Sequence, residues 1–176
     1  MSSEKKFPTD VTPKYIPFDN EHSDILKNGE PRPLDLAKEF KDSTVIVTAI
    51  PGSFTTVCST KHIPAYIDHI KQFKEKGVKR IIVFATNDPF VQASFGKALG
   101  YKDAENFIIF ATDPEGKISS QLGKDYLLDM SKAGMGLRLE RYAAIVVNGN
   151  ITYIGNESEG NFSDISSPEN LLEKLN

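Results

Sequence analysis

Short runs of apolar residues alternate, in the middle of the chain, with longer stretches in which apolar residues recur three or four positions apart. The short runs are typical of buried strands, and the longer stretches are typical of helices with one apolar face. Strands are therefore predicted at 44–50, 80–85 and 107–111, and helices at 59–75 and 89–99. Asp88 and Pro89 mark the start of the second helix, because aspartate caps helices and proline suits the first helical position. This alternation predicts a parallel βαβ core.

The remaining segments add an antiparallel pair and two short helices. The helices are expected over residues 118–122 and 171–175. Between them, strands at 142–147 and 151–154 flank an Asn-Gly-Asn sequence that is typical of a tight hairpin turn. Residues 1–35 contain five prolines and many polar residues, which indicates an irregular or hairpin-like extension. The whole order resembles the thioredoxin-like arrangement, an α/β fold in which helices flank a mixed central sheet.

Composition and charge limit the classes of partner. The chain has 176 residues of which 39% are hydrophobic, enough for one domain that spans residues 1–176. Lysine and arginine number 21 against 24 aspartates and glutamates, a net charge of −3, so neither nucleic acid nor an anionic membrane is an expected partner. No apolar run approaches the roughly 18 residues needed to cross a bilayer. The N-terminus has no apolar signal region, so we expect a protein that stays inside the cell.

Cys58 is the one cysteine of the sequence, which leaves no partner for an intramolecular disulfide and no cysteine cluster for a metal. It falls between the first strand and the developed part of the following helix. One interpretation is a buried, inert residue, because free cysteine is among the most buried residue types. The other is a nucleophile, because the free N–H groups of a helix N-terminus stabilise a thiolate. Position alone favours neither.

The residues before Cys58 carry further candidate chemistry. Thr55 is well placed to cap the helix, which would aim the thiol at the same N–H donors. Its hydroxyl is also able to bind a substrate oxygen, and the ring of Pro51 is able to shield the thiol from water.

These residues closely resemble the active-site segment of the peroxiredoxins, whose pattern is proline, three residues, threonine or serine, two residues, cysteine. Pro51, Thr55 and Cys58 match it. The branch is the alkyl hydroperoxide reductase type, related to mammalian peroxiredoxin five and to the fungal and plant type-two peroxiredoxins. Further similarity covers nearly the whole chain, at His62–Ile63–Pro64, Asn87–Asp88–Pro89, Asp113–Pro114 and Arg141–Tyr142. Thr56 stands where these proteins usually have proline.

The resemblance implies an enzyme, a thiol-dependent peroxidase for hydrogen peroxide and alkyl hydroperoxides. On it, Cys58 is the peroxidatic cysteine, Thr55 bonds the peroxide and Pro51 shields the thiolate. Arg141 activates both thiolate and peroxide, although without the resemblance it would be interpreted as a surface charge at the start of a strand. His62 is a positioning residue near the pocket rather than a general base.

The missing second cysteine bears on how the enzyme is regenerated. Relatives that form a disulfide carry another cysteine, whereas this sequence has one, so we expect a one-cysteine mechanism in which an external thiol reduces the sulfenic acid. Glutathione with glutaredoxin, or thioredoxin, would serve. The alternative is a redox sensor or relay protein with a reactive Cys58 and little turnover; an adaptor with an inert cysteine is a third reading.

Other expectations concern ligands, assembly and location. Cys58 and His62 lie four residues apart, on a helical face that His69 could nominally extend, but no third strong ligand has matching spacing, so neither a metal nor another cofactor is expected. The resemblance implies a homodimer that pairs near the active-site loop. The sequence ends Lys174–Leu175–Asn176 rather than in a peroxisomal Ser-Lys-Leu tripeptide, which favours the cytoplasm.

Overall fold

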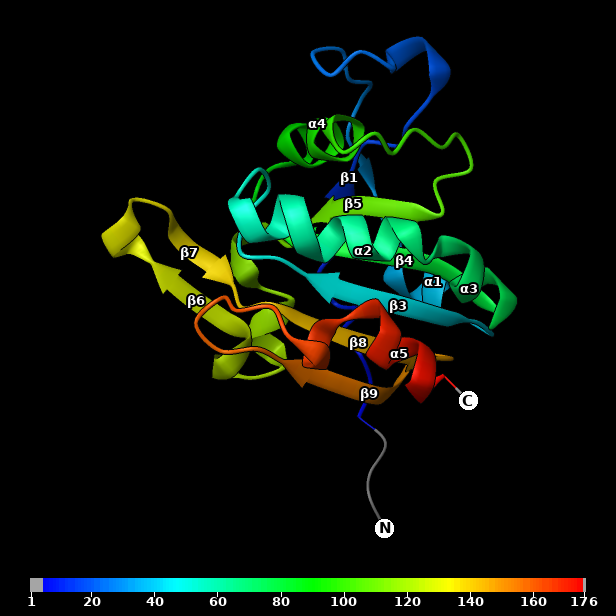
Figure 1. The fold of residues 1–176 in the computed structure, drawn as a ribbon, viewed down its shortest axis with the longest axis vertical. Helices are drawn as coiled ribbons and strands as arrows, with labels where there is room; N and C mark the ends of the chain where they lie inside the picture. The colour runs from blue at the N-terminus through cyan, green and yellow to red at the C-terminus, as the bar shows by residue number, and fades with distance from the viewer. Residues whose placement is uncertain (1–4, 176) are drawn as a thin grey trace.

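A seven-stranded mixed sheet forms the centre of the molecule (Figure 1). The computed structural model describes residues 5–175. The sheet has the order β2-β1-β5-β4-β3-β8-β9, in which β3, β4 and β5 are parallel and the other pairs are antiparallel. Its strands are β1 (Lys14–Tyr15), β2 (Arg32–Pro33), β3 (Thr44–Ala49), β4 (Val78–Ala85), β5 (Ile108–Thr112), β8 (Tyr142–Val147) and β9 (Asn150–Asn156). The predicted parallel core and C-terminal antiparallel pair are thereby confirmed.

Helices cover both faces of this sheet unequally. One face is covered by α2 (Ile63–Asp68), α3 (Ile70–Glu75), α4 (Pro89–Ala98) and α5 (Pro168–Lys174), which lie in front of the strands in Figure 1. The other face is covered by α1 (Leu36–Phe40), the N-terminal segment and short 3₁₀ turns. Alternate residues of β3 serve the two cores: Val45 and Val47 pack on the α1 side, Ile46 on the α2 side. Thr48 therefore points to the α2 side, where it meets the functional site.

The helix predicted as continuous over 59–75 is divided. It begins as a π-helical turn, η2 (Cys58–His62), continues as α2, and stops at His69 before α3. Pro64 has no N–H to donate to the preceding turn, which favours the wider π turn. At His69 the ring nitrogen Nδ1 lies 2.7 Å from the Ala65 carbonyl, so a side chain replaces part of the backbone hydrogen bonding there.

Other elements agree in part with the expected ones, and neither α1 nor a second sheet was predicted. Asp88 accepts a hydrogen bond from the Val91 N–H and begins α4, as predicted. The predicted helix over 118–122 is a single 3₁₀ turn, η4 (Ser119–Gln121). A second, two-stranded sheet, β6 (Leu127–Met130) and β7 (Gly136–Leu139), was not predicted; it projects from the body to one side in Figure 1. Its alternation is short and is interrupted by two glycines, so the sequence gives little signal for it.

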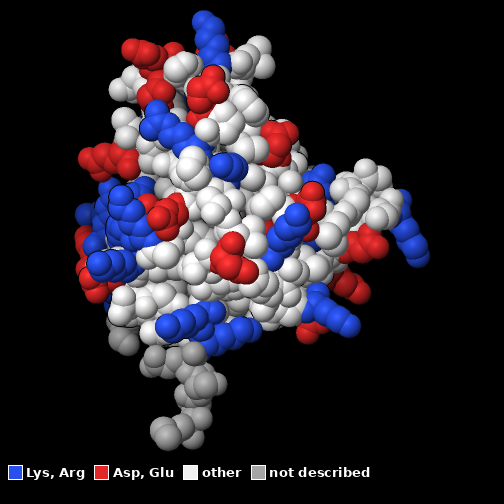
Figure 2. All heavy atoms as spheres, turned by 180° about the vertical axis from the view of Figure 1, so that it is seen from behind, with Lys and Arg blue, Asp and Glu red and all other residues white. Residues whose placement is uncertain are grey.

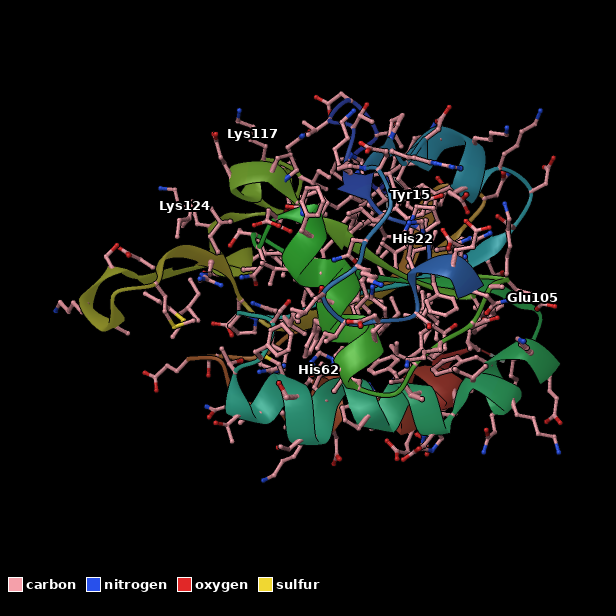
Figure 3. The ribbon with its side chains drawn as sticks, turned by 90° about the horizontal axis from the view of Figure 1, so that it is seen from above. Tyr15, His22, His62, Glu105, Lys117 and Lys124 are labelled. Carbon is pink, nitrogen blue, oxygen red and sulfur yellow. The ribbon has the colours of Figure 1, made fainter. Side chains whose placement is uncertain are left out.

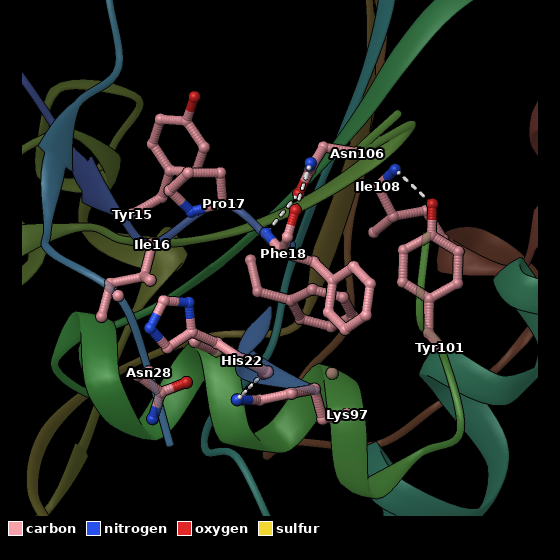
Figure 4. A pocket seen from close by; sticks show the side chains of 14 residues that line it. Tyr15, Ile16, Pro17, Phe18, His22, Asn28, Lys97, Tyr101, Asn106 and Ile108 are labelled. Atoms are coloured by element: carbon pink, nitrogen blue, oxygen red, sulfur yellow. Dashed lines mark hydrogen bonds between the residues drawn. The ribbon is translucent and has the colours of Figure 1, made fainter. Parts of the chain in front are cut away.

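A buried lysine and Ser94, both on α4, hold the N-terminal segment against that helix. Lys97 Nζ donates to the carbonyl oxygens of His22, Asp24 and Lys27 at 2.9, 2.8 and 2.6 Å. Figure 4 shows Lys97 and His22 beside a small cavity of about 30 Å³ beneath this segment. The polar side chains beside the cavity bind the protein itself; Tyr101, for example, accepts from the Ile108 N–H. The extension expected to be irregular or hairpin-like contains the antiparallel pair of β1 and β2 and closes one edge of the molecule.

The surface carries charges of both signs. On the face seen from behind in Figure 2, lysine and arginine lie among aspartate and glutamate side chains. Among residues 5–175, no helix combines the length and apolar character needed to cross a membrane.

Candidate active site

Cys58 lies at the first residue of the π-helical turn, after the loop that leaves β3. Its side chain is fully buried and belongs to the apolar core between the sheet and α2. Burial in apolar surroundings alone would favour the neutral thiol. The polar groups that reach its sulfur therefore decide what chemistry is available.

A guanidinium group reaches that sulfur from β8. Arg141, just before the strand, is 2% exposed, and its Nη2 lies 3.0 Å from Cys58 Sγ. A buried cation needs an anionic partner, and a thiolate at this distance supplies one. The pair was predicted to work together, and the structure brings the two side chains into direct contact across 83 residues of sequence.

His62 holds the other end of the guanidinium. Arg141 Nη1 donates to His62 Nδ1 at 2.5 Å, and His62 Nε2 lies 2.8 Å from the Thr48 hydroxyl oxygen. Thr48 gives its own proton to the Tyr142 carbonyl, so it accepts the proton of Nε2. His62 is consequently neutral, with the lone pair of Nδ1 turned to Arg141.

Burial and the nearby positive charge both keep His62 neutral. The ring is completely buried, and burial, followed by the charge of Arg141, lowers its pKa well below the ordinary value of 6.5. In Figure 3 His62 lies on the inner side of the helix that contains it, far from His22 and Tyr15. The ring of Phe162 stacks on it, with centroids 4.9 Å apart.

Thr55 does not cap the helix with its side chain as expected. Its hydroxyl donates to the Gly52 carbonyl at 2.7 Å, while its backbone carbonyl accepts from the Ser59 N–H. The hydroxyl thus retains its lone pairs for an O–H group that enters the site. Pro51 is buried. Its ring lies close to Gly160 in the loop that follows β9, because a Cβ on that glycine would be 3.8 Å from the ring.

The loop that carries these residues is held from outside by Arg138, in β7. Its Nη1 donates to the Asn87 side-chain oxygen at 3.2 Å and lies 3.4 Å from the Pro51 carbonyl. Asn87 Oδ1 also accepts the Ser53 N–H at 2.9 Å. A Cβ on Gly52 would lie 2.9 Å from Arg138 Nη1, so a side chain at this position would displace the end of the Arg138 side chain.

Sequence reasoning identified the reacting pair but missed the supporting residues Thr48, Asn87 and Arg138. Thr48 lies in an apolar strand, where a threonine is ordinary. Because side chains of a strand alternate between its two faces, Thr48 lies on the same face as Ile46, and this alternation could have placed it on the α2 side. Asn87 was noted only as part of the resemblance. Arg138 belongs to the strand pair that was not predicted.

The arrangement suits nucleophilic attack by sulfur rather than metal chemistry. Within the described part of the chain, no three His, Cys, Asp or Glu side chains gather in a group that could hold a metal ion. A buried thiolate, an arginine that stays charged and a threonine with free lone pairs can instead bind a small polar molecule and stabilise negative charge as it moves.

Comparison with known proteins adds an independent line of information. The Redoxin family model matches residues 3–172 of the chain. A Lipomyces kononenkoae protein named "Putative peroxisomal peroxiredoxin" is 47% identical over 155 residues, 88% of this chain and 90% of that protein.

Solved structures are similar over the full length. Reduced Prx3 from Vibrio vulnificus, in complex with hydrogen peroxide, has a TM-score of 0.82 and 28% identity, and the match covers 100% of this chain and 99% of that one. The Plasmodium falciparum antioxidant protein, a 1-Cys peroxiredoxin, has a TM-score of 0.79 and 26% identity, covering 99% and 98%. The expected thioredoxin-like fold is thereby confirmed.

Proposed function

The chain belongs to the peroxiredoxin family and is a thiol-dependent peroxidase, an oxidoreductase, and within that activity we propose that Cys58 is the residue oxidised by the peroxide. Arg141 stabilises its thiolate and the reacting peroxide. Thr55 accepts the O–H of the peroxide, and Pro51 keeps water away from the sulfur. The single cysteine of the chain fits a one-cysteine mechanism.

The observation that carries these roles is the 3.0 Å contact between Arg141 Nη2 and Cys58 Sγ in a fully buried site. The other guanidinium donors are held by His62 and by carbonyls of the 157–166 loop. The group is therefore fixed before the peroxide arrives, and little reorganisation is needed as charge moves.

The first half-reaction transfers one oxygen atom. The thiolate sulfur of Cys58 attacks the terminal oxygen of ROOH, the S–O bond forms and the O–O bond breaks. Sulfur is oxidised to the sulfenic acid, and the alkoxide or hydroxide that leaves takes a proton and departs as alcohol or water. The positive charge of Arg141 faces the negative charge in this step.

The second half-reaction needs a thiol from outside the chain. One thiol condenses with the sulfenic acid, releasing water and forming a mixed disulfide at Cys58; a second thiol reduces it and restores the thiolate. We propose glutathione with glutaredoxin, or thioredoxin, as the reductant. Because Cys58 is fully buried, the thiol can reach it only when the π-helical turn opens.

The test is a stopped-flow reaction of reduced protein with one equivalent of hydrogen peroxide or tert-butyl hydroperoxide, followed by mass spectrometry of Cys58. We expect rapid sulfenic acid formation that is absent in Cys58→Ser and slowed about 10²- to 10³-fold in Arg141→Gln. Arg80→Gln, which removes an arginine bound to Glu39 on another part of the sheet, is the control with normal rate.

Oxidation no faster than that of an ordinary free thiol, or unchanged in Arg141→Gln, would contradict the proposed roles. Fast oxidation of Cys58 without steady peroxide consumption, when either reductant is supplied, would instead favour a redox sensor or relay protein.

Three further points belong to the same proposal. Residues 1–176 form one redoxin domain. Two copies pair near the active-site loop. The protein acts in the cytoplasm. The peroxisome is the alternative, because the Lipomyces relative is named a peroxisomal peroxiredoxin. Imaging of a fluorescent fusion protein distinguishes the two locations.

A further inference from the structure

A buried carboxylate organises the loop that follows β9. Glu157 is 6% exposed, and its carboxylate accepts hydrogen bonds from both the N–H and the hydroxyl of Ser163 and of Ser166. These bonds span six and nine residues of chain, at 2.8–3.2 Å. They close residues 157–166 into a loop whose two ends are fixed at one side chain.

The segment between those ends contacts the active-site cation and its histidine. The carbonyls of Gly160 and Asn161 accept from Arg141 Nε at 3.4 and 3.1 Å. Phe162 stacks on His62, which holds Arg141 Nη1. Within residues 5–175, the hydrogen bonds of the guanidinium other than that to Cys58 are therefore either with this loop or with a ring that this loop covers.

A second carboxylate joins the same segment to the backbone of Arg141. Glu140 is 4% exposed, and its Oε1 accepts the Gly160 N–H at 2.8 Å and the Arg141 N–H at 3.0 Å. The tip of the loop is thus held to the residue it orients, while Glu157 holds the base of the loop. In the described part of the chain, neither carboxylate hydrogen-bonds to the guanidinium itself or to Cys58.

We propose that Glu157 is a positioning residue for the peroxidase reaction, which acts through the 157–166 loop to fix the guanidinium of Arg141 against the Cys58 sulfur. This inference rests on the proposed function. It adds that the loop, which carries no cysteine and has no chemistry of its own, is part of the machinery that prepares the thiolate.

The physical argument is geometric. Arg141 has only one contact with the reacting atom, through Nη2, and its orientation about that contact depends on what holds Nε and Nη1. If Glu157 releases the loop, the carbonyls and the Phe162 ring lose their fixed positions, and Arg141 gains freedom to turn away from sulfur. Misplacement of an orienting group by about 1 Å is enough to slow a reaction about 10²-fold.

The test uses Glu157→Gln, which keeps the shape but turns an amide N–H₂ toward the serine donors, with Glu159→Gln as the matched control. Glu159 lies two residues away in the same loop and is exposed. We expect Glu157→Gln to slow sulfenic acid formation tenfold or more and to move thiolate formation at Cys58, followed by its ultraviolet absorbance, to higher pH. Glu159→Gln should match the wild type in both measurements.

A double variant separates positioning from general loosening of the fold. If Glu157 acts through Arg141, adding Glu157→Gln to Arg141→Gln causes no further slowing, because the group it positions is already gone. A further tenfold loss in the double variant would overturn the inference. So would a single variant that reacts like the wild type.

A milder variant covers the case in which Glu157→Gln folds poorly. Ser163 is exposed, and Ser163→Ala removes one donor of the carboxylate while the backbone N–H remains. It should produce a smaller shift of the same sign. An unchanged rate in Ser163→Ala, together with a melting temperature below that of the wild type, would overturn the positioning role. If the wild type itself forms no sulfenic acid rapidly, the proposed function fails first, and the two failures are thereby distinguishable.

Discussion

Arg141 is a buried cation, and the groups that hold two of its nitrogens leave its positive charge unneutralised. Its side chain is 2% exposed, and the groups that hold Nε and Nη1 are neutral: two backbone carbonyls and the neutral ring of His62. The remaining contact, through Nη2, is with Cys58 Sγ. Under the proposed function, a Cys58 thiolate is the anion that pairs with this buried cation.

The neutrality of His62 has a measurable effect on stability. Its pKa is lowered in the folded protein by burial and by Arg141, whereas in the unfolded chain it returns to about 6.5. Below about pH 6.5 the unfolded state therefore binds one more proton, and the free energy of unfolding falls by up to about 1.4 kcal/mol per pH unit from this residue. In His62→Gln this part of the acid dependence should disappear.

Urea unfolding at several pH values between about 5 and 7 checks this expectation. His69→Gln serves as the control, because His69 is partly exposed beside Glu169 and its replacement leaves His62 in place. If the free energy of unfolding changed with pH equally in the wild type and in His62→Gln, His62 would have to be protonated to the same extent in the folded and unfolded states.

At the residue scale, one short pattern and a single matching arginine led to Cys58, Pro51, Thr55 and Arg141 as candidates, and their catalytic roles stay predictions. The structure brings Cys58 and Arg141 into contact. The hydrogen bond of Thr55 was predicted wrongly, because a hydroxyl can either accept at a helix start or donate to a nearby carbonyl, and only the path of the loop decides. The loop contacts of Arg141 are separated by about 20 residues and leave no local pattern.

At the scale of elements, Cys58 and His62 lie at the two ends of the π-helical turn and face the same side. Both are buried and both contact Arg141, and the turn ends at the residue before Ile63 and Pro64. The spacing of apolar residues predicted a helix here but not its pitch, since the same residues can form an α or a π turn. The missing N–H of Pro64 and the ring of His69 are local causes that periodicity does not register.

The helix that bears Cys58 begins with an exposed residue whose replacement should stabilise the protein. Thr56 is the first helical residue, and Thr55 before it is not helical, so proline is compatible with both positions. Thr56→Pro should raise the free energy of unfolding by about 0.4–1 kcal/mol, mainly because the unfolded chain loses freedom. Urea unfolding measures the change.

Thr60→Pro is the matched control for Thr56→Pro. Thr60 lies within the π turn, where proline interrupts the hydrogen bonding, so this variant should lose about 3 kcal/mol. Destabilisation by Thr56→Pro would show that the start of the helix has a backbone conformation unsuited to proline.

At the scale of the whole molecule, exposed apolar side chains gather around the active-site loop. Phe54 is 53% exposed, Phe90 50% and Leu137 46%. All three lie near α4, which contains Phe90 in its first turn. Phe54 packs edge-on against Phe95 of that helix. The Leu137 carbonyl accepts a hydrogen bond from the Thr86 hydroxyl, just before the helix. A clustered apolar surface of this kind is typical of an interface, which supports the proposed dimer.

Disruption of that surface should produce a monomer. We expect the wild type to sediment as two copies of the 19.5 kDa chain, 2 × 19.5 = 39.0 kDa, and Leu137→Glu to sediment as one. Leu26→Glu is the control, because Leu26 is 89% exposed and lies on the N-terminal segment rather than in the cluster. Analytical ultracentrifugation decides; a dimer that persists in Leu137→Glu but is lost in Leu26→Glu would place the interface at the N-terminal segment.

The N-terminal segment illustrates how one side chain can make a long stretch of chain cooperative. The backbone of residues 22–27 forms little regular structure of its own, yet the single ammonium of Lys97 binds three of its carbonyls at once. Loss of that ammonium would remove a donor from all three carbonyls in one event, although the Asp24 carbonyl also accepts the Lys27 N–H and the Ile25 carbonyl accepts the Ser94 hydroxyl, so most of the attachment of this stretch to α4 would be lost at once. We therefore expect it to exchange its amide protons as one unit, with a common opening free energy, although its sequence is that of an ordinary surface loop.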